Sequence, residues 1–115
     1  MIEFFRRENP FSYTQARRHP RFATDFLVRV RNGEQRTSDR VRNLSEGGVA
    51  IDTRAPLAPM TLVQLTLEIP SEPKPIDLVG RVMWATDAAM GVRFEQSDSR
   101  VLECVDHLSR EAERL

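Results

Sequence analysis

The sequence is poor in cysteine and in long apolar runs, and each of these shortages excludes a class of protein. Cys104 is the single cysteine among 115 residues, which excludes an internal disulfide framework and a cysteine-based metal site. No run approaches the roughly 18 apolar residues of a membrane span, and charges at the N-terminus arrive too early for a secretory signal peptide. We therefore expect a cytoplasmic protein.

Charge is balanced overall but unevenly distributed. Seventeen Lys and Arg residues balance seventeen Asp and Glu residues, which argues against bulk nucleic-acid binding because that requires many phosphate contacts at once. Residues 1–54 carry eleven Arg against seven acids, a charge of +4, whereas residues 55–115 carry six basic residues against ten acids, a charge of −4. All basic residues except Lys74 are Arg, whose planar fork grips phosphate and stacks on bases. A small anion site in the basic half is compatible with these charges.

Length and composition indicate one globular domain. At 115 residues, with 40% apolar and 30% charged residues, the chain is long enough for one core and too short for two ordinary domains. Residues 1–21 show no sustained hydrophobic period. We expect residues 1–16 to form an N-terminal tail and residues 17–115 to form the domain.

Alternating apolar and polar residues predict a β-structure. The expected strands cover residues 26–31, 37–44, 49–51, 63–69, 76–84 and 90–94. Asn32-Gly33 indicates a type I′ hairpin between the first two strands. Short strands separated by turn residues favour a small six-stranded antiparallel barrel. Trp84 shares the parity of Val82, which predicts a core position rather than a platform for base stacking.

The C-terminal segment changes to a helical period. Apolar residues recur at steps of four and three, at Val101, Val105, Leu108, Ala112 and Leu115. Ser97 or Asp98 is the expected N-cap. Cys104 lies beside this stripe, so we expect it to pack rather than to act as a nucleophile.

Two arginines on a proline-restrained segment form the first candidate site. Arg17 and Arg21 are four residues apart, and Pro20 pushes His19 toward an extended backbone. The segment between the two arginines spans at most about 13 to 14 Å, enough to wrap a compact ligand. The alternative is a solvated basic linker.

A polar turn forms the second candidate site. Asn43 and Ser45 are two residues apart at a strand end, so both face outward if Leu44 faces the core. Gly47 and Gly48 permit positive φ and close approach of backbone N–H groups to a ligand. The alternative is a turn stabilised by hydrogen bonds from side chain to backbone, which is compatible with ligand binding.

Together the two patterns resemble the signature motifs of the PilZ domain family, RxxxR and (D/N)xSxxG. Arg17 and Arg21 match the first motif, and Asn43, Ser45 and Gly48 match the second. The resemblance implies binding of the bacterial second messenger cyclic di-GMP, whose two phosphodiesters and guanine edges suit guanidinium and amide groups.

The resemblance covers residues 15–115, including segments 48–51, 80–84 and 91–94. It implies the same six-stranded barrel with a C-terminal α-helix that the periodicity predicts. Family members often carry a basic residue at the position of Arg18, which contacts phosphate or water. The residue before the first motif arginine influences whether one or two ligands bind, and the small Ala16 does not exclude a pair.

We therefore expect a non-enzymatic cyclic di-GMP receptor without cofactor. It changes the conformation of its N-terminal segment on binding and signals to an unidentified protein partner. Neither a carboxylate pair nor a glycine-rich phosphate loop before a helix is present, and His19 and His107 have no third residue with which to bind a metal. The alternatives are a PilZ-fold interaction module that does not use the nucleotide and a small barrel that binds single-stranded nucleic acid.

Overall fold

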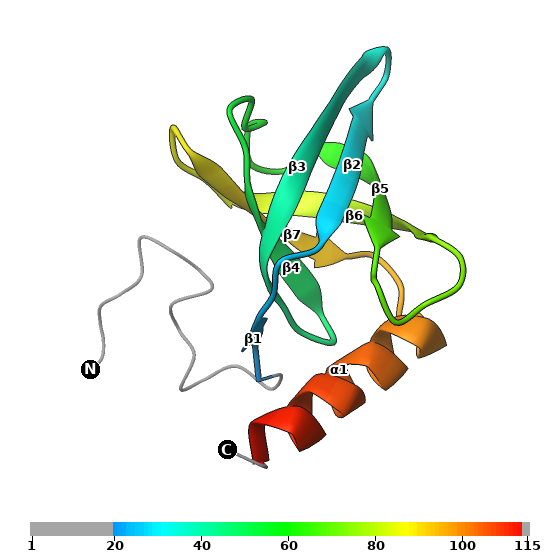
Figure 1. Ribbon diagram of the computed structural model, residues 1–115. Coiled ribbons are helices and arrows are strands. Elements are labelled where there is room, and N and C mark those ends of the chain that lie inside the picture. The colour runs from blue at the N-terminus through cyan, green and yellow to red at the C-terminus, as the bar shows by residue number, and fades with distance from the viewer. Residues whose placement is uncertain (1–19, 114–115) are drawn as a thin grey trace, which may run out of the picture.

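The computed structural model describes residues 20–113, which form seven strands and one helix (Figure 1). The elements are β1 (Phe22–Ala23), β2 (Leu27–Asn32), β3 (Gln35–Leu44), β4 (Gly48–Asp52), β5 (Leu62–Glu68), β6 (Ile76–Ala85), β7 (Ala89–Phe94) and α1 (Ser99–Glu113). Six of the strands were predicted from the sequence, and β1 is an additional short strand that precedes them.

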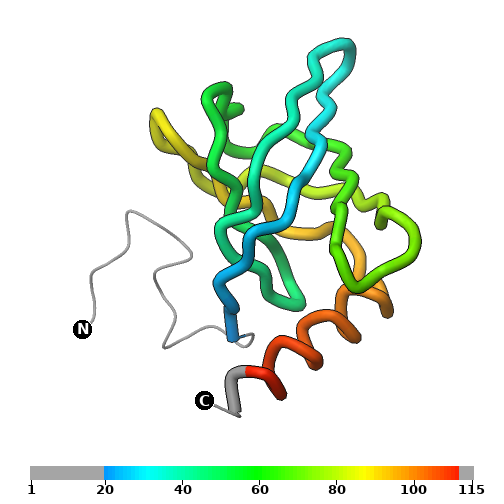
Figure 2. The backbone as a smooth tube through the Cα atoms, viewed as in Figure 1, coloured from blue at the N-terminus to red at the C-terminus, as the bar shows by residue number. Residues whose placement is uncertain are grey.

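The strands close into an antiparallel barrel. Their order is β1-β3-β2-β5-β6-β7-β4, and β4 also pairs with β3, which joins the two ends of the six-stranded sheet. Strand β1 continues the line of β2 and pairs with the end of β3. Figure 2 shows the β2–β3 hairpin projecting at one end of the barrel and α1 lying across the other. The predicted barrel with a C-terminal helix is therefore confirmed.

The core follows the predicted hydrophobic periods. In β5, Val63, Leu65 and Leu67 are buried while Gln64 is exposed, as expected for a strand with one face toward the core. In α1, apolar residues on one stripe are buried against the same core, namely Val101, Cys104 and Val105.

Asp98 is the N-cap of α1. Its Oδ1 accepts hydrogen bonds from the backbone N–H of Arg100 at 2.8 Å and of Val101 at 3.3 Å. These bonds satisfy two of the backbone donors that a helix leaves unpaired at its start. Of the two predicted caps, the structure therefore selects Asp98.

The β2–β3 turn differs from the prediction. Asn32 pairs with Gln35, so the loop residues are Gly33 and Glu34 instead of Asn32 and Gly33. Gly33 has φ 63°, and positive φ elsewhere in the described residues occurs at Met60. Positive φ at the first loop position alone is typical of a type II′ turn. Asn32 therefore stays extended within β2.

As predicted, Trp84 is buried in a core cluster and is not a stacking platform, but a β-bulge places it on a different face from Val82. Val82 pairs with Val92, but Trp84 pairs with Gly91, which inserts one extra residue into β6. One extra residue turns the following side chains to the other face of a sheet. Trp84 packs in a separate small cluster with Ala50 and Ala89, away from the main core.

Candidate functional site

The turn between β3 and β4 is closed by the side chain of Ser45. Its Oγ accepts hydrogen bonds from the N–H of Gly47 at 3.2 Å and of Gly48 at 3.1 Å. The N–H of Ser45 donates to the carbonyl of Gly48 at 2.9 Å. Ser45 is buried beside Leu44 because strand β3 ends there and the alternation of faces stops. The hydroxyl therefore shapes the turn and does not project outward as expected.

The two glycines of the turn do not use the left-handed region. In the part of the chain that the structure describes, positive φ occurs at Gly33 and Met60. The carbonyl of Gly47 instead accepts a hydrogen bond from the N–H of Phe94 at 2.9 Å. This bond ties the turn to the end of β7.

A row of residues crosses four strands on the outer face of the barrel. Asn43 lies opposite Ala50, Ala50 lies opposite Gly91, and Gly91 lies opposite Trp84. Ala50 and Gly91 have little or no side chain, and the indole of Trp84 packs over Gly91, so the middle of the row is filled. The row thus places an amide at one end, beside a floor formed by Ala50 and the indole of Trp84.

The amide of Asn43 has an unsatisfied acceptor. Its Oδ1 is buried and has no hydrogen-bond partner among the residues that the structure describes. A buried polar atom without a hydrogen bond costs about 1 to 3 kcal/mol, and such an atom requires an explanation. An N–H or O–H donor of a ligand at this face would satisfy it.

Trp84 and Gly91 are packed directly against each other. A Cβ atom at position 91 would lie 2.1 Å from Trp84 Nε1 and 2.4 Å from Trp84 Cε2. Only a glycine leaves room for the ring. Trp84 is 7% exposed, so the indole supports the floor and does not present an open stacking surface.

Two arginines adjoin this face. Arg21 is half-buried immediately before β1, and the pairing of Phe22 with Leu44 brings it next to the Ser45 turn. Burial lowers the pKa of its guanidinium, which stays charged at neutral pH. Arg93 is exposed opposite Gly48, and it follows Gly91 by two residues on the same side of β7.

The structure therefore brings Arg21, Asn43, Ser45, Gly47 and Gly48 to one end of the barrel. Two other predicted site residues, Arg17 and Arg18, lie outside the described residues.

Sequence reasoning missed the contributions of Ala50, Trp84, Gly91 and Arg93 to this face. Ala50 meets Gly91 through the pairing of β4 with β7, which are far apart in the chain, whereas Trp84 meets Gly91 across the β6–β7 hairpin. For Trp84 the decisive feature is the bulge, which no local sequence pattern marked.

The described part of the chain shows no metal centre and no membrane span. Within residues 20–113, no three side chains of His, Cys, Asp or Glu come close enough to hold a metal ion. The described helix is not long and apolar enough to cross a membrane.

Comparison with known proteins gives one family and several similar structures. The family model of the PilZ domain matches residues 15–111. No curated protein matches the chain.

Among solved structures, the Bacillus subtilis inhibitor of motility MotI/DgrA has a TM-score of 0.74 at 14% identity, covering 87% of this chain and 53% of that one. The K. pneumonia MrkH–c-di-GMP complex has a TM-score of 0.72 at 23% identity, covering 87% of this chain and 55% of the other. The PilZ domain of YcgR from Escherichia coli, solved with c-di-GMP, has a TM-score of 0.71 at 16% identity, with coverage of 87% and 96%. The chain thus spans about half the length of the first two proteins, and the similarities show a shared fold.

Proposed function

The chain belongs to the PilZ domain family, and from this premise we propose that it is a receptor for cyclic di-GMP. The observation that carries the proposal is the buried, unsatisfied Oδ1 of Asn43, on the outer face beside Arg21 and the Ser45 turn. Two of the similar structures, MrkH and the YcgR domain, are described as complexes with this nucleotide.

Each element of the site has a proposed role. Arg17, Arg18 and Arg21 bind the phosphates and guanine edges, because a guanidinium forms paired hydrogen bonds with either. The Oδ1 of Asn43 accepts a hydrogen bond from a guanine N–H or a ribose hydroxyl. Ser45 acts indirectly by holding the turn in shape.

The neighbouring surface suits a flat ligand. Gly47 and Gly48 add no side chains at the β4 end of the turn, and Ala50 and the Trp84 indole form the adjoining floor. Arg93 is exposed and makes no ion pair with another described residue, so its charge is available to a phosphate at the edge of this floor.

Ligand binding orders the N-terminal segment in this proposal. The segment leads directly into β1, and β1 pairs with the end of β3 that carries Asn43. A nucleotide held by arginines before β1 and by Asn43 on β3 would join the two, which shifts the population toward an ordered segment. A protein partner then reads the changed surface. The alternative is a PilZ-fold interaction module that does not use the nucleotide.

Calorimetric titration of the full chain with cyclic di-GMP tests the proposal. We expect saturable heat, with a molar ratio near one or two that distinguishes a single from a paired ligand. The Arg17→Ala/Arg21→Ala variant should lose at least about tenfold in affinity, since one hydrogen bond to a charged group contributes about 1.5 to 3 kcal/mol. Arg54→Ala is the matched control, because Arg54 is exposed in the loop after β4. No heat from the folded wild-type protein would favour the interaction module.

A further inference from the structure

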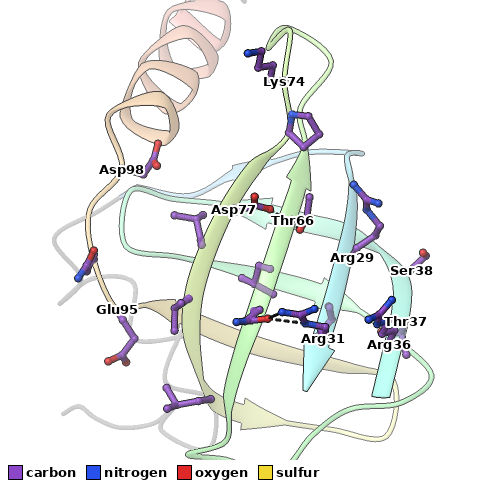
Figure 3. Close-up of a pocket in the computed structure, with 18 of the residues that line it drawn as sticks. Arg29, Arg31, Arg36, Thr37, Ser38, Thr66, Lys74, Asp77, Glu95 and Asp98 are labelled. Atoms are coloured by element: carbon purple, nitrogen blue, oxygen red, sulfur yellow. Dashed lines mark hydrogen bonds between the residues drawn. The ribbon is translucent and has the colours of Figure 1, made fainter. Parts of the chain in front are cut away.

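A second surface lies on the other side of the barrel. A cavity of about 1280 Å³ is bounded by β2, β3, β5 and β6, by the end of the loop before β6 and by the segment after β7 (Figure 3). In the closed strand order, β2 lies across the barrel from β7, and β5 lies across from β4. This cavity is therefore separate from the outer face that carries Asn43.

One wall of the cavity carries two arginines that face each other. Arg31 lies directly opposite Arg36 in the β2–β3 hairpin. The guanidinium of Arg31 donates through Nε to the neutral amide of Gln64 at 2.6 Å. Arg36 is exposed and forms no hydrogen bond or ion pair with any described residue. Like charges directly opposite each other destabilise a β-ladder, so this arginine pair lacks a balancing anion.

The carboxylates of the cavity are already engaged. Asp77 accepts a hydrogen bond from Thr66 Oγ1 at 2.8 Å, and Glu95 pairs with Arg81 at 3.3 Å. Asp98 caps α1. Figure 3 shows Glu95 and Asp98 on the side opposite the arginine pair. The positive charge is therefore concentrated on one wall, without an acid from the described chain to neutralise it.

Exposed apolar side chains lie beside the arginine pair. Leu62 and Val79 line the same cavity and are 48% and 47% exposed. Met60, just before β5, is 61% exposed and has φ 77°. Its N–H donates to the carbonyl of Val82 at 2.6 Å, which holds this unfavourable backbone in place. Apolar side chains bordered by arginine are typical of protein interfaces.

We propose that this cavity is the docking site for an acidic segment of a partner protein. Carboxylates of the segment bind the arginine pair, and one apolar side chain of the segment packs on Leu62 and Val79. A single-stranded nucleic acid fits less well because Leu62 and Val79 are aliphatic and offer no aromatic ring on which a base could stack. The proposal extends the partner role described above, and its test contains no nucleotide, so either proposal can fail alone.

Selection of random peptides displayed on phage, with the full chain as target, tests the docking site. We expect enriched peptides to contain several Asp or Glu residues and at least one large apolar residue. Their affinity for the Arg36→Glu variant should fall at least about tenfold, as for loss of a close charge pair at an interface. Arg36→Glu places an acid opposite Arg31, so this variant should remain folded, as its melting temperature will show.

Two further measurements complete the test. Arg54→Glu makes the same change of charge on an exposed residue outside the cavity and should leave peptide affinity unchanged. Leu62→Ser should weaken peptide binding, because it removes the apolar surface on which a side chain of the peptide packs. Enrichment of basic or neutral peptides, no enrichment, or equal binding to the Arg36→Glu variant would overturn the proposal. So would tight binding of a single-stranded oligonucleotide that depends on Arg36.

Discussion

The indole of Trp84 lies so close to Gly91 that a Cβ atom at position 91 would come within 2.1 Å of the ring nitrogen. This contact exists because a bulge in β6 turns Trp84 to the outer face, where Gly91 of β7 is its cross-strand partner. The pair forms one end of the floor that we assign to the nucleotide. The packing of Trp84 against Gly91 can be tested by unfolding measurements, separately from ligand binding.

Gly91→Ala should destabilise the fold by about 1 to 3 kcal/mol, the usual cost of overpacking. The physical reason is that β7 or the indole must move to admit the methyl group. Thermal unfolding followed by circular dichroism measures the change. In a Trp84→Leu background the same substitution should cost less, because the smaller side chain leaves room, and an equal cost in both backgrounds would contradict direct packing.

Ser45→Ala should lower the free energy of unfolding by about 1 to 3 kcal/mol. The buried Oγ accepts two backbone N–H groups of the turn, and alanine leaves both without this partner. Urea denaturation gives the difference. Ser38→Ala, at an exposed position of β3, is the matched control and should be neutral. If both variants have wild-type stability, Ser45 does not hold the turn.

Asn43→Ala should separate stability from binding. Because Asn43 Oδ1 is buried without a partner, its removal should leave thermal stability in the absence of ligand unchanged or higher. Affinity for cyclic di-GMP should fall about fivefold, in line with one hydrogen bond of about 1 kcal/mol. The two readouts are a melting curve and a calorimetric titration. A marked loss of stability with unchanged affinity would assign Asn43 a structural role instead.

Cys104 should make stability depend on pH in the alkaline range. Burial, reinforced by the charge of Glu72, raises the pKa of its thiol in the folded protein. The folded state then retains the proton that the unfolded chain releases, so this contribution is complete below the ordinary thiol pKa. It is lost as pH rises through that value toward the raised pKa. Urea unfolding at several pH values should show a steeper alkaline decline for the wild type than for Cys104→Ala, and identical slopes would contradict the shift.

Local sequence patterns were sufficient to predict most of the fold. The alternation in β5 and the helical stripe of α1 each depend on neighbours within one element, so they can be read without knowing the partner strands. The β3–β4 turn was likewise visible, because Ser45 and the following glycines act within a few residues of each other. The motif arginines suggested a family that the domain match confirms.

The candidate face and the second cavity were decided by tertiary pairing. Parity placed Trp84 with Val82, but the bulge opposite β7 separates them. Non-local hydrogen bonding between strands sets Ala50 against Gly91 and brings Arg31 opposite Gln64 of β5. The amino-acid sequence by itself determined which residues alternate and where the chain turns, because both are local. Which side chains meet across strands required the closed barrel, since register is fixed by pairing between distant segments.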